Sequence, residues 1–467
     1  MATLLRVARP PARARASEAL RGLGATDGVL ARAGAGERRR PLADRSSGHS
    51  RSHGWGSHRL RASADGMKRG VGEIPTPSRK PRVSAKGLGA AALNWQVWVL
   101  ALIALYAWLF VRFGLREGVI GFDFEGTLWN PAQAILDGLS PYPAPVVAEV
   151  EVGNPALYPP LLMLVVAPLT VLPWPIGLAL WTAVLGTAVA ATLYILDVRD
   201  VRCYLVALAS LPTVSGLVFG NGTLLLVPLV ALAWRWREHW LRSGVVVGVA
   251  IAAKLFLWPL LFWLLATRRY RAFGAAVVAT GAGLIVPWAL IGFAGFSAYP
   301  DLLRVAEEVY AVHSYSVATM LGALGTDTQL ASRSALALGV VLTAVAFYAG
   351  RRAADSTSLS LAVLAAVLGS PIVWPYYFAL LLVPVAIARP RFSVLWASLG
   401  LFYVAELQPR SEFDAGATCC RPESVPLHVW LFNNSPSGLW PALAYAALAA
   451  ALMALTVRAM LRARAAS

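Results

Sequence analysis

The chain alternates between long, unbroken apolar segments and short polar interruptions. Its mean hydropathy is +0.61 and only 14% of its residues are charged, whereas soluble domains are about a quarter charged. An apolar run of about 20 residues crosses a bilayer as a helix, while the strands of an outer-membrane barrel alternate in polarity over about ten residues. The pattern therefore predicts an all-α polytopic membrane protein.

The first predicted span covers residues 93–113, and further apolar segments follow it along the chain. They lie at residues 158–173, 175–196, 203–219, 222–236, 243–266, 272–294, 333–350, 357–370, 373–388, 393–406 and 437–457. We therefore expect a bundle of about twelve transmembrane or re-entrant helices, with short surface helices in the outer loops.

The charges between these segments predict their orientation. Basic residues precede the first span, and arginines cluster between many later segments, which places those turns in the cytoplasm by the positive-inside rule. The loop at residues 114–157 holds six acidic residues and one arginine, so we expect it outside. Residues 295–332 and 407–436 are two further outer stretches.

Two regions conflict with a simple succession of spans. Two spans between residues 158 and 196 would return the chain to the outside, yet Arg199 and Arg202 favour the inside. Segment 243–266 has basic residues at both ends. Prolines, including Pro168 and Pro259, favour broken or re-entrant helices in these regions, and such helices are tolerated where the backbone lines a cavity.

The formal net charge of +17 is concentrated in residues 1–90, which contribute +13 with 19 basic and 6 acidic residues. This leader lacks an apolar period and is predicted to be disordered, so residues 91–467 form the membrane domain. Two explanations for residues 1–66 stay open. Met67 is the true start, or the leader is a basic tail that contacts anionic lipid.

Asp123 and Glu125 lie in a GFDFEGTLW stretch just beyond the first span. The segment that follows places Leu128, Ala132, Ile135 and Leu136 on one helical face, as in a helix on the membrane surface. A carboxylate held there can act as a general base toward a hydroxyl of a lipid-linked substrate. The alternative is a pair of solvated loop acids.

Lys254 lies at least ten residues from either end of an apolar segment, where a charge costs a few kcal/mol. We expect it to face a polar cavity and to bind a phosphate as a point charge. The alternative is a lysine whose side chain extends to the interface.

Other polar and aromatic residues interrupt the apolar segments and are candidates for lining a substrate cavity. They are Tyr158, Asn221, His313, Ser316, Trp374, Tyr376 and Tyr377. The simpler alternative is an interface residue for the aromatic side chains, and a turn at Gly220–Thr223 for Asn221. The three cysteines have no metal-ligand spacing, so no metal site is predicted and a divalent cation stays open.

In order along the chain, DGLSPY, LYPPLLMLVVAP, a GNG turn, GVVVGVAIAAKLFLWP, HSYS and SPIVWPYY resemble glycosyltransferase family 87, the DUF2029 group. The resemblance covers about residues 93–457. Two patterns depart from it, because the turn at Gly220 lacks the family's glutamine and SPIVWPYY lacks its histidines. The sugar and the acceptor therefore stay unassigned.

The resemblance implies a GT-C fold and an inverting glycosyltransferase of the bacterial plasma membrane. Such an enzyme moves a monosaccharide from a polyprenyl-phosphate donor to a lipid or glycan acceptor at the extracytoplasmic face. It places the catalytic acid at Asp123, the phosphate-binding lysine at Lys254 and the YPP motif at Tyr158–Pro160. A transporter or lipid flippase, or a non-catalytic scaffold, is the alternative, and no nucleic acid partner is expected.

Overall fold

The computed structural model describes residues 97, 99–109, 111, 119–152, 154–311, 314–352, 355–406 and 439–465. The predicted leader, the whole 407–436 loop and His313 lie outside these residues. Within them, every regular element is a helix. All of the apolar segments predicted from residue 158 onward coincide with helical structure.

Four helices are long and apolar enough to cross a membrane: α6 (Trp174–Ile195), α12 (Tyr270–Leu290), α15 (Thr328–Arg352) and α21 (Leu439–Ala465). The pair α7 (Val201–Ala209) and α8 (Leu211–Phe219) is bent by 57° and would make a fifth. The other apolar helices have only 10–17 residues. Because a helix rises 1.5 Å per residue, 17 residues reach about 26 Å, short of a hydrocarbon core of about 30 Å. The expected count of about twelve spans is thus not confirmed.

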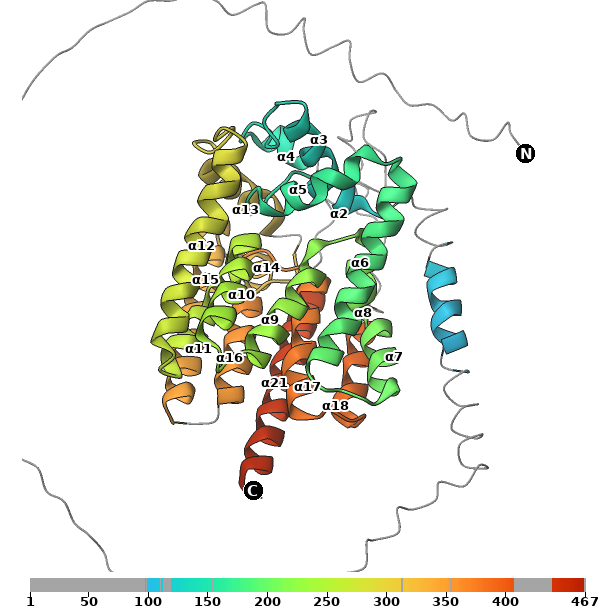
Figure 1. Ribbon diagram of the computed structural model, residues 1–467, viewed down its shortest axis with the longest axis vertical. Helices are drawn as coiled ribbons and strands as arrows, with labels where there is room; N and C mark the ends of the chain where they lie inside the picture. The colour runs from blue at the N-terminus through green and yellow to red at the C-terminus, as the bar shows by residue number, and fades with distance from the viewer. Residues whose placement is uncertain are drawn as a thin grey trace, which may run out of the picture. The chain divides into compact units, whose positions relative to one another are not determined.

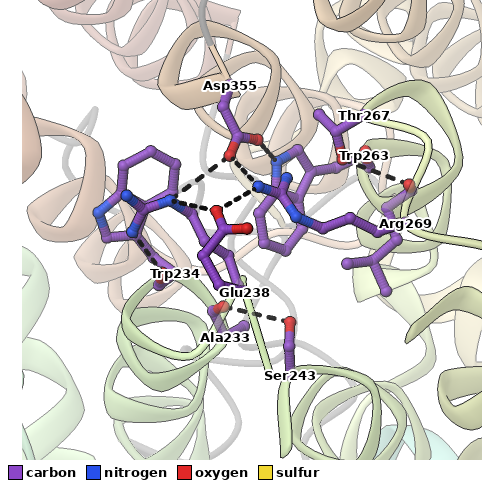
Figure 2. A network of polar contacts seen from close by, with 10 residues as sticks. Ala233, Trp234, Glu238, Ser243, Trp263, Thr267, Arg269 and Asp355 are labelled. Carbon is purple, nitrogen blue, oxygen red and sulfur yellow. Dashed lines mark hydrogen bonds and ion pairs between the residues drawn. The ribbon is translucent and has the colours of Figure 1, made fainter. Parts of the chain in front are cut away.

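The shorter helices form hairpins, most clearly α10 (Trp240–Ala253) and α11 (Pro259–Ala266). Glu238 precedes α10 and Arg269 follows α11, and their carboxylate and guanidinium are 2.9 Å apart (Figure 2). Both ends of segment 240–266 therefore lie on the same side, which accounts for the basic residues at both of its ends. Lys254 is at the turning point, in extended backbone with φ −148° and ψ 112°.

Two further groups of short helices also have an end near Arg269. The helix α9 (Leu226–Arg235) follows the 3₁₀ turn η4 (Gly222–Leu225), and α16 (Asp355–Leu368) is followed by η7 (Pro375–Leu381) and α17 (Leu382–Ala388). Asp355 accepts from Arg269 at 2.7 Å and lies 3.5 Å from Arg237, just past α9. We call this side, around Arg237, Arg269 and Asp355, the basic end.

The opposite end carries the short helices of the acidic loop (Figure 1). The loop forms α2 (Phe122–Phe124), η2 (Glu125–Trp129), α3 (Asn130–Leu136) and α4 (Val147–Val152). The same end also carries α5 (Leu161–Val166) with η3 (Ala167–Val171), and α13 (Tyr299–Tyr310). We call it the loop end. Since α5 stays at the loop end, α6 alone crosses toward the basic end (Figure 1). Arg199 and Arg202 follow directly after α6, at the start of α7. The conflict in the sequence between residues 158 and 196 disappears.

The predicted surface helix after Asp123 is present, and α13 is a second amphipathic helix, in the predicted outer stretch 295–332. In η2 and α3, Leu128 and Ala132 are fully buried, whereas Leu136 is exposed. In α13, Leu302 and Ala306 pack into the core. The amphipathic patterns therefore identified helices that cover the bundle at the loop end.

Small residues allow a close helix contact between α10 and α12. A methyl group added at Gly244 would lie 2.4 Å from the Ala272 carbonyl oxygen, and one at Gly248 would lie 2.5 Å from Ala279 Cβ. The GxxxG spacing of these glycines lets two helix backbones approach closely, as is common among membrane helices.

The remaining helices complete the core. They are α14 (Val317–Ala323), α18 (Val394–Ala397), η8 (Ser398–Gly400) and α19 (Leu401–Glu406), and a short apolar helix at Val99–Leu109 contacts α7 through Tyr106.

Candidate active site

A cavity of about 380 Å³ lies where the loop end meets the turning points of the helix hairpins. Asp123 and Lys254 both line it, although 130 residues separate them in the chain. Asp123 is 5% exposed and Lys254 is 3% exposed. The carboxylate and the ammonium group therefore share one largely desolvated site.

Asn221 joins these two groups. Its Nδ2 donates to Asp123 Oδ2 at 2.7 Å and to the Tyr158 hydroxyl at 3.0 Å. Its Oδ1 accepts from Lys254 Nζ at 3.2 Å. The backbone N–H of Thr223, which can only donate, also reaches this oxygen at 2.9 Å, and it fixes the orientation of the amide.

The local backbone explains why Asn221 points this way. Gly220 ends α8 with φ 70°, a left-handed conformation that a glycine adopts without strain, and a Cβ there would lie 2.7 Å from that of Phe124. Asn221 then caps η4 through the Thr223 N–H. The Gly220–Thr223 segment is thus a turn, as the simpler alternative held, and it also supports the site, although Asn221 lies behind the cavity wall rather than on it.

Asp123 is held by several donors. Asn154 Nδ2 donates to its Oδ1 at 3.0 Å, and Tyr376 also hydrogen bonds to the carboxyl. Burial raises the pKa of the Asp123 carboxyl above its usual value, whereas the hydrogen bonds and the charge of Lys254 oppose the rise.

Lys254 is held from two sides. Its Nζ donates to Thr223 Oγ1 at 2.6 Å as well as to Asn221. The rings of Tyr158 and Tyr377 lie with their centroids 4.1 and 4.8 Å from Nζ, in the range of cation–π contacts. The side chain therefore does not extend to a surface, contrary to the simpler alternative, but occupies the centre of the site.

Only some of the other candidate residues line the cavity. Tyr158, Trp374, Tyr376 and Tyr377 line the cavity. Glu125 is exposed and is not among the lining residues. Ser316 is 2% exposed, caps α14 by accepting from the Thr319 N–H, and is not among the lining residues. His313 lies outside the described residues.

Sequence reasoning missed several polar residues of the cavity wall, among them Asn154 and Glu307. Asn154 directly precedes the proline that opens the second apolar region. Glu307 shares one face of α13 with Tyr299, Leu303 and Tyr310, which lie eight, four and three residues from it, all helical spacings. The spacing could therefore have identified Glu307 as a cavity residue, but only with the knowledge that this face of α13 covers a cavity.

Among the described residues, no group of three or more His, Cys, Asp or Glu side chains is placed to hold a metal ion. The cavity instead combines one buried carboxylate, one buried ammonium group, amide groups and aromatic rings. Such a site can take a proton at one position and hold a negative charge at another.

A comparison with known proteins bears on this chemistry. No curated protein and no solved structure matches the chain. Residues 156–375 match the family model of glycosyltransferase family 87. The match includes Tyr158, Asn221, Lys254 and Trp374, and it begins after Asp123. Over these residues the chain is therefore similar to glycosyltransferase family 87.

Proposed function

We propose that the protein moves a monosaccharide from a polyprenyl-phosphate donor to a hydroxyl of a lipid or glycan acceptor, at the outer face of a bacterial plasma membrane. The observation that carries this proposal is the single cavity lined by Asp123 and Lys254, in a chain that matches a glycosyltransferase family. One group suits the attacking hydroxyl and the other suits the departing phosphate.

Asp123 is the proposed general base. The two oxygens of a carboxylate offer about four acceptor positions, and Asn221, Asn154 and Tyr376 fill three of them. One position is left for the acceptor hydroxyl. The acceptor oxygen attacks the anomeric carbon as its proton passes to Asp123, and the bond from that carbon to the phosphate oxygen breaks. A single displacement of this kind inverts the anomeric centre.

Lys254 is the proposed site of the leaving phosphate. An ammonium group has three N–H donors, and the oxygens of Asn221 and Thr223 accept two. The third can donate to a phosphate oxygen whose negative charge grows as the glycosyl bond breaks. A fixed positive group in a desolvated site stabilises that charge strongly.

Glu307 is the proposed contact for sugar hydroxyls. It is the only charged residue that α13 contributes to the cavity wall, among the aromatic rings of Tyr299 and Tyr310. A phosphate would be repelled here, whereas hydroxyls donate well to a carboxylate. The neutral part of a substrate therefore fits this side and its phosphate fits the Lys254 side.

The membrane placement follows from the charges of the two ends. We infer that the basic end is cytoplasmic and that the loop end is extracytoplasmic. The hairpins α8–α9, α10–α11 and α16–α17 then enter from the cytoplasm and turn below the outer surface. Counted as half-spans with the long helices, they account for about twelve apolar segments in a GT-C-like arrangement.

The experiment is a transfer assay on the purified protein. It is incubated with a panel of radiolabelled polyprenyl-phosphate sugars and a membrane glycolipid extract. We expect label to pass from one donor to an acceptor lipid or glycan, and Lys254→Met to abolish this while the protein stays folded. A transporter or flippase would instead move a labelled lipid across vesicles without covalent change. That result, with no transfer from any donor, would contradict the proposal.

A further inference from the structure

A second cavity of about 350 Å³ opens at the basic end, between the α9–α10 turn and the start of α12. Its lining includes four arginines, at positions 237, 268, 269 and 271, and one acid, Glu238. The proposed transfer reaction takes place at the loop end and does not use this cavity.

Two of the arginines hold the fold together. Figure 2 shows Glu238, Arg269 and Asp355 pointing toward one another from three separate segments. Arg269 lies 2.7 Å from Asp355 and 2.9 Å from Glu238, and Trp263 Nε1 donates to the other Asp355 oxygen at 2.8 Å. Arg237 lies 3.5 Å from Asp355. Two carboxylates therefore balance these two arginines.

The other two arginines of the cavity lie outside this network of ion pairs. Within the part of the chain that the structure describes, Arg268 and Arg271 form no ion pair, and both are exposed at the cavity. A nitrogen of Arg269, Nη1, is buried there without a hydrogen-bond partner. The first residues of α12 also line the cavity, and no side chain caps this helix start. The cavity thus has an excess of about two positive charges and several unused donors.

Arg268 occupies a position where its backbone is strained. Its φ of 61° is left-handed, a conformation that costs a residue with a Cβ about 1 kcal/mol or more, and that glycine would adopt freely. Stability alone therefore favours glycine at this position. An arginine there is consistent with a use for its side chain.

The surroundings of the cavity belong to a membrane surface. Trp240 begins α10 and Tyr270 begins α12, and their side chains are 49% and 55% exposed at the ends of apolar helices. Aromatic residues in such places lie at the level of lipid headgroups. The basic charge and the aromatic rim therefore occur together at one bilayer depth.

We propose that this cavity binds the phosphate headgroup of an anionic phospholipid in the leaflet at the basic end. Guanidinium groups bind phosphate oxygens in pairs, and basic pockets between membrane helices bind such headgroups. Arg268 and Arg271 contact the phosphate, while Trp240 and Tyr270 lie beside the glycerol and the first acyl carbons. The lipid thereby contacts both ends of the hairpin that carries Lys254.

The test measures lipid binding to the full chain in detergent by native mass spectrometry, with phosphatidylglycerol and phosphatidylcholine of identical acyl chains. Glycerol phosphate provides the same phosphate chemistry without a lipid. We compare the wild type with Arg268→Gln/Arg271→Gln and with Arg351→Gln/Arg352→Gln. The second pair removes the same charge from exposed arginines near the basic end that do not line the cavity.

We expect the wild type and the Arg351/Arg352 variant to bind phosphatidylglycerol in preference to phosphatidylcholine. The Arg268/Arg271 variant should bind it about tenfold more weakly, because charge-assisted hydrogen bonds are lost. Since Lys keeps the charge without the forked geometry, Arg268→Lys/Arg271→Lys should recover part of the affinity. The melting temperature of each variant without lipid serves as the folding control.

Three results would overturn the proposal. The first is an equal loss of affinity in both double Gln variants, which would indicate general charge rather than a site. The second is no preference of the wild type for phosphatidylglycerol. The third is equally tight binding of glycerol phosphate, which would assign the cavity to a soluble phosphate ester.

Discussion

At the residue scale, the amide of Asn221 couples the two charged groups of the proposed active site. It donates to Asp123 and accepts from Lys254, so one side chain fixes the position of both. Asn221 does not itself line the cavity, and we therefore regard it as a positioning residue. Its amide is also a neutral donor, so it hydrogen bonds to Asp123 without placing a second charge beside it.

Replacing this amide by a carboxylate tests that role. In Asn221→Asp, a second carboxyl group lies about as close to Asp123 as the 2.7 Å hydrogen bond does now. A like charge raises the pKa of Asp123 further, and since the base acts only when ionised, the rising limb of kcat/KM should move to higher pH by about one unit or more. Gln133→Glu makes the same chemical change on the exposed surface of α3 and should leave the profile in place. An unchanged profile in Asn221→Asp would contradict the coupling.

At the element scale, the helix hairpins determine where the reactive groups meet. Lys254 and Asn221 are both at turning points, and the chain reverses there because a glycine or an extended residue ends each first helix. The sequence indicates a break near Pro259, but the structure breaks the helix at Lys254. Proline fits the first turn of α11, and its ring and missing N–H disturb the turn before it, so the interruption falls several residues earlier.

Gly220 offers a stability test of one turning point. Gly220→Ala and Gly138→Ala both place a Cβ on a left-handed residue, with φ of 70° and 73°, at about 1 kcal/mol each. Only at Gly220 does the new Cβ meet a neighbour, Phe124, at 2.7 Å, while nothing lies within 4 Å of it at Gly138. We expect Gly220→Ala to lower the melting temperature clearly more, by a further overpacking cost of about 1–3 kcal/mol. Equal losses in the two variants would argue against the tight contact.

Glu307 and Glu308 provide a matched pair on α13. Glu307 lines the cavity, whereas Glu308 pairs with Arg304 at 2.8 Å on the exposed side. If Glu307 binds substrate hydroxyls, Glu307→Gln should raise KM for one substrate about tenfold or more with a smaller change in kcat. Glu308→Gln should leave both constants unchanged, because exposed ion pairs contribute little. Steady-state kinetics with donor and acceptor varied in turn distinguish these outcomes, and equal effects of the two variants would exclude Glu307 as a contact.

At the scale of the whole molecule, acidic surface segments and arginine-rich turns are at opposite ends of one bundle (Figure 1). Hydropathy predicted the helical class and nearly every helical segment, because apolar runs and polar interruptions are local properties of the chain. The pairing of short helices into hairpins depends on contacts such as Glu238 with Arg269, which no local pattern contains. The position of the Asn221 amide between Asp123 and Lys254 could not be predicted from the sequence either, because its orientation comes from the folded turn.

Single-cysteine labelling tests the orientation of the two ends. In a background with Cys203, Cys419 and Cys420 replaced by Ser, Asp137→Cys reports on the loop after α3 and Arg391→Cys reports on the turn after α17. Both positions are exposed. A membrane-impermeant thiol reagent should label Asp137→Cys in intact bacterial cells and Arg391→Cys only after permeabilisation. The reverse pattern would place the proposed active site in the cytoplasm.

The central claim is that Asp123 removes the proton of the acceptor hydroxyl in sugar transfer. The most direct measurement compares transfer of radiolabelled sugar by the wild type, Asp123→Asn and Glu125→Gln at equal amounts of folded protein. Glu125 is two residues away, exposed and outside the cavity. We predict that Asp123→Asn lowers kcat about 10²–10⁴-fold, the usual contribution of a general base, and that Glu125→Gln retains the wild-type rate. Wild-type transfer by Asp123→Asn would contradict the account.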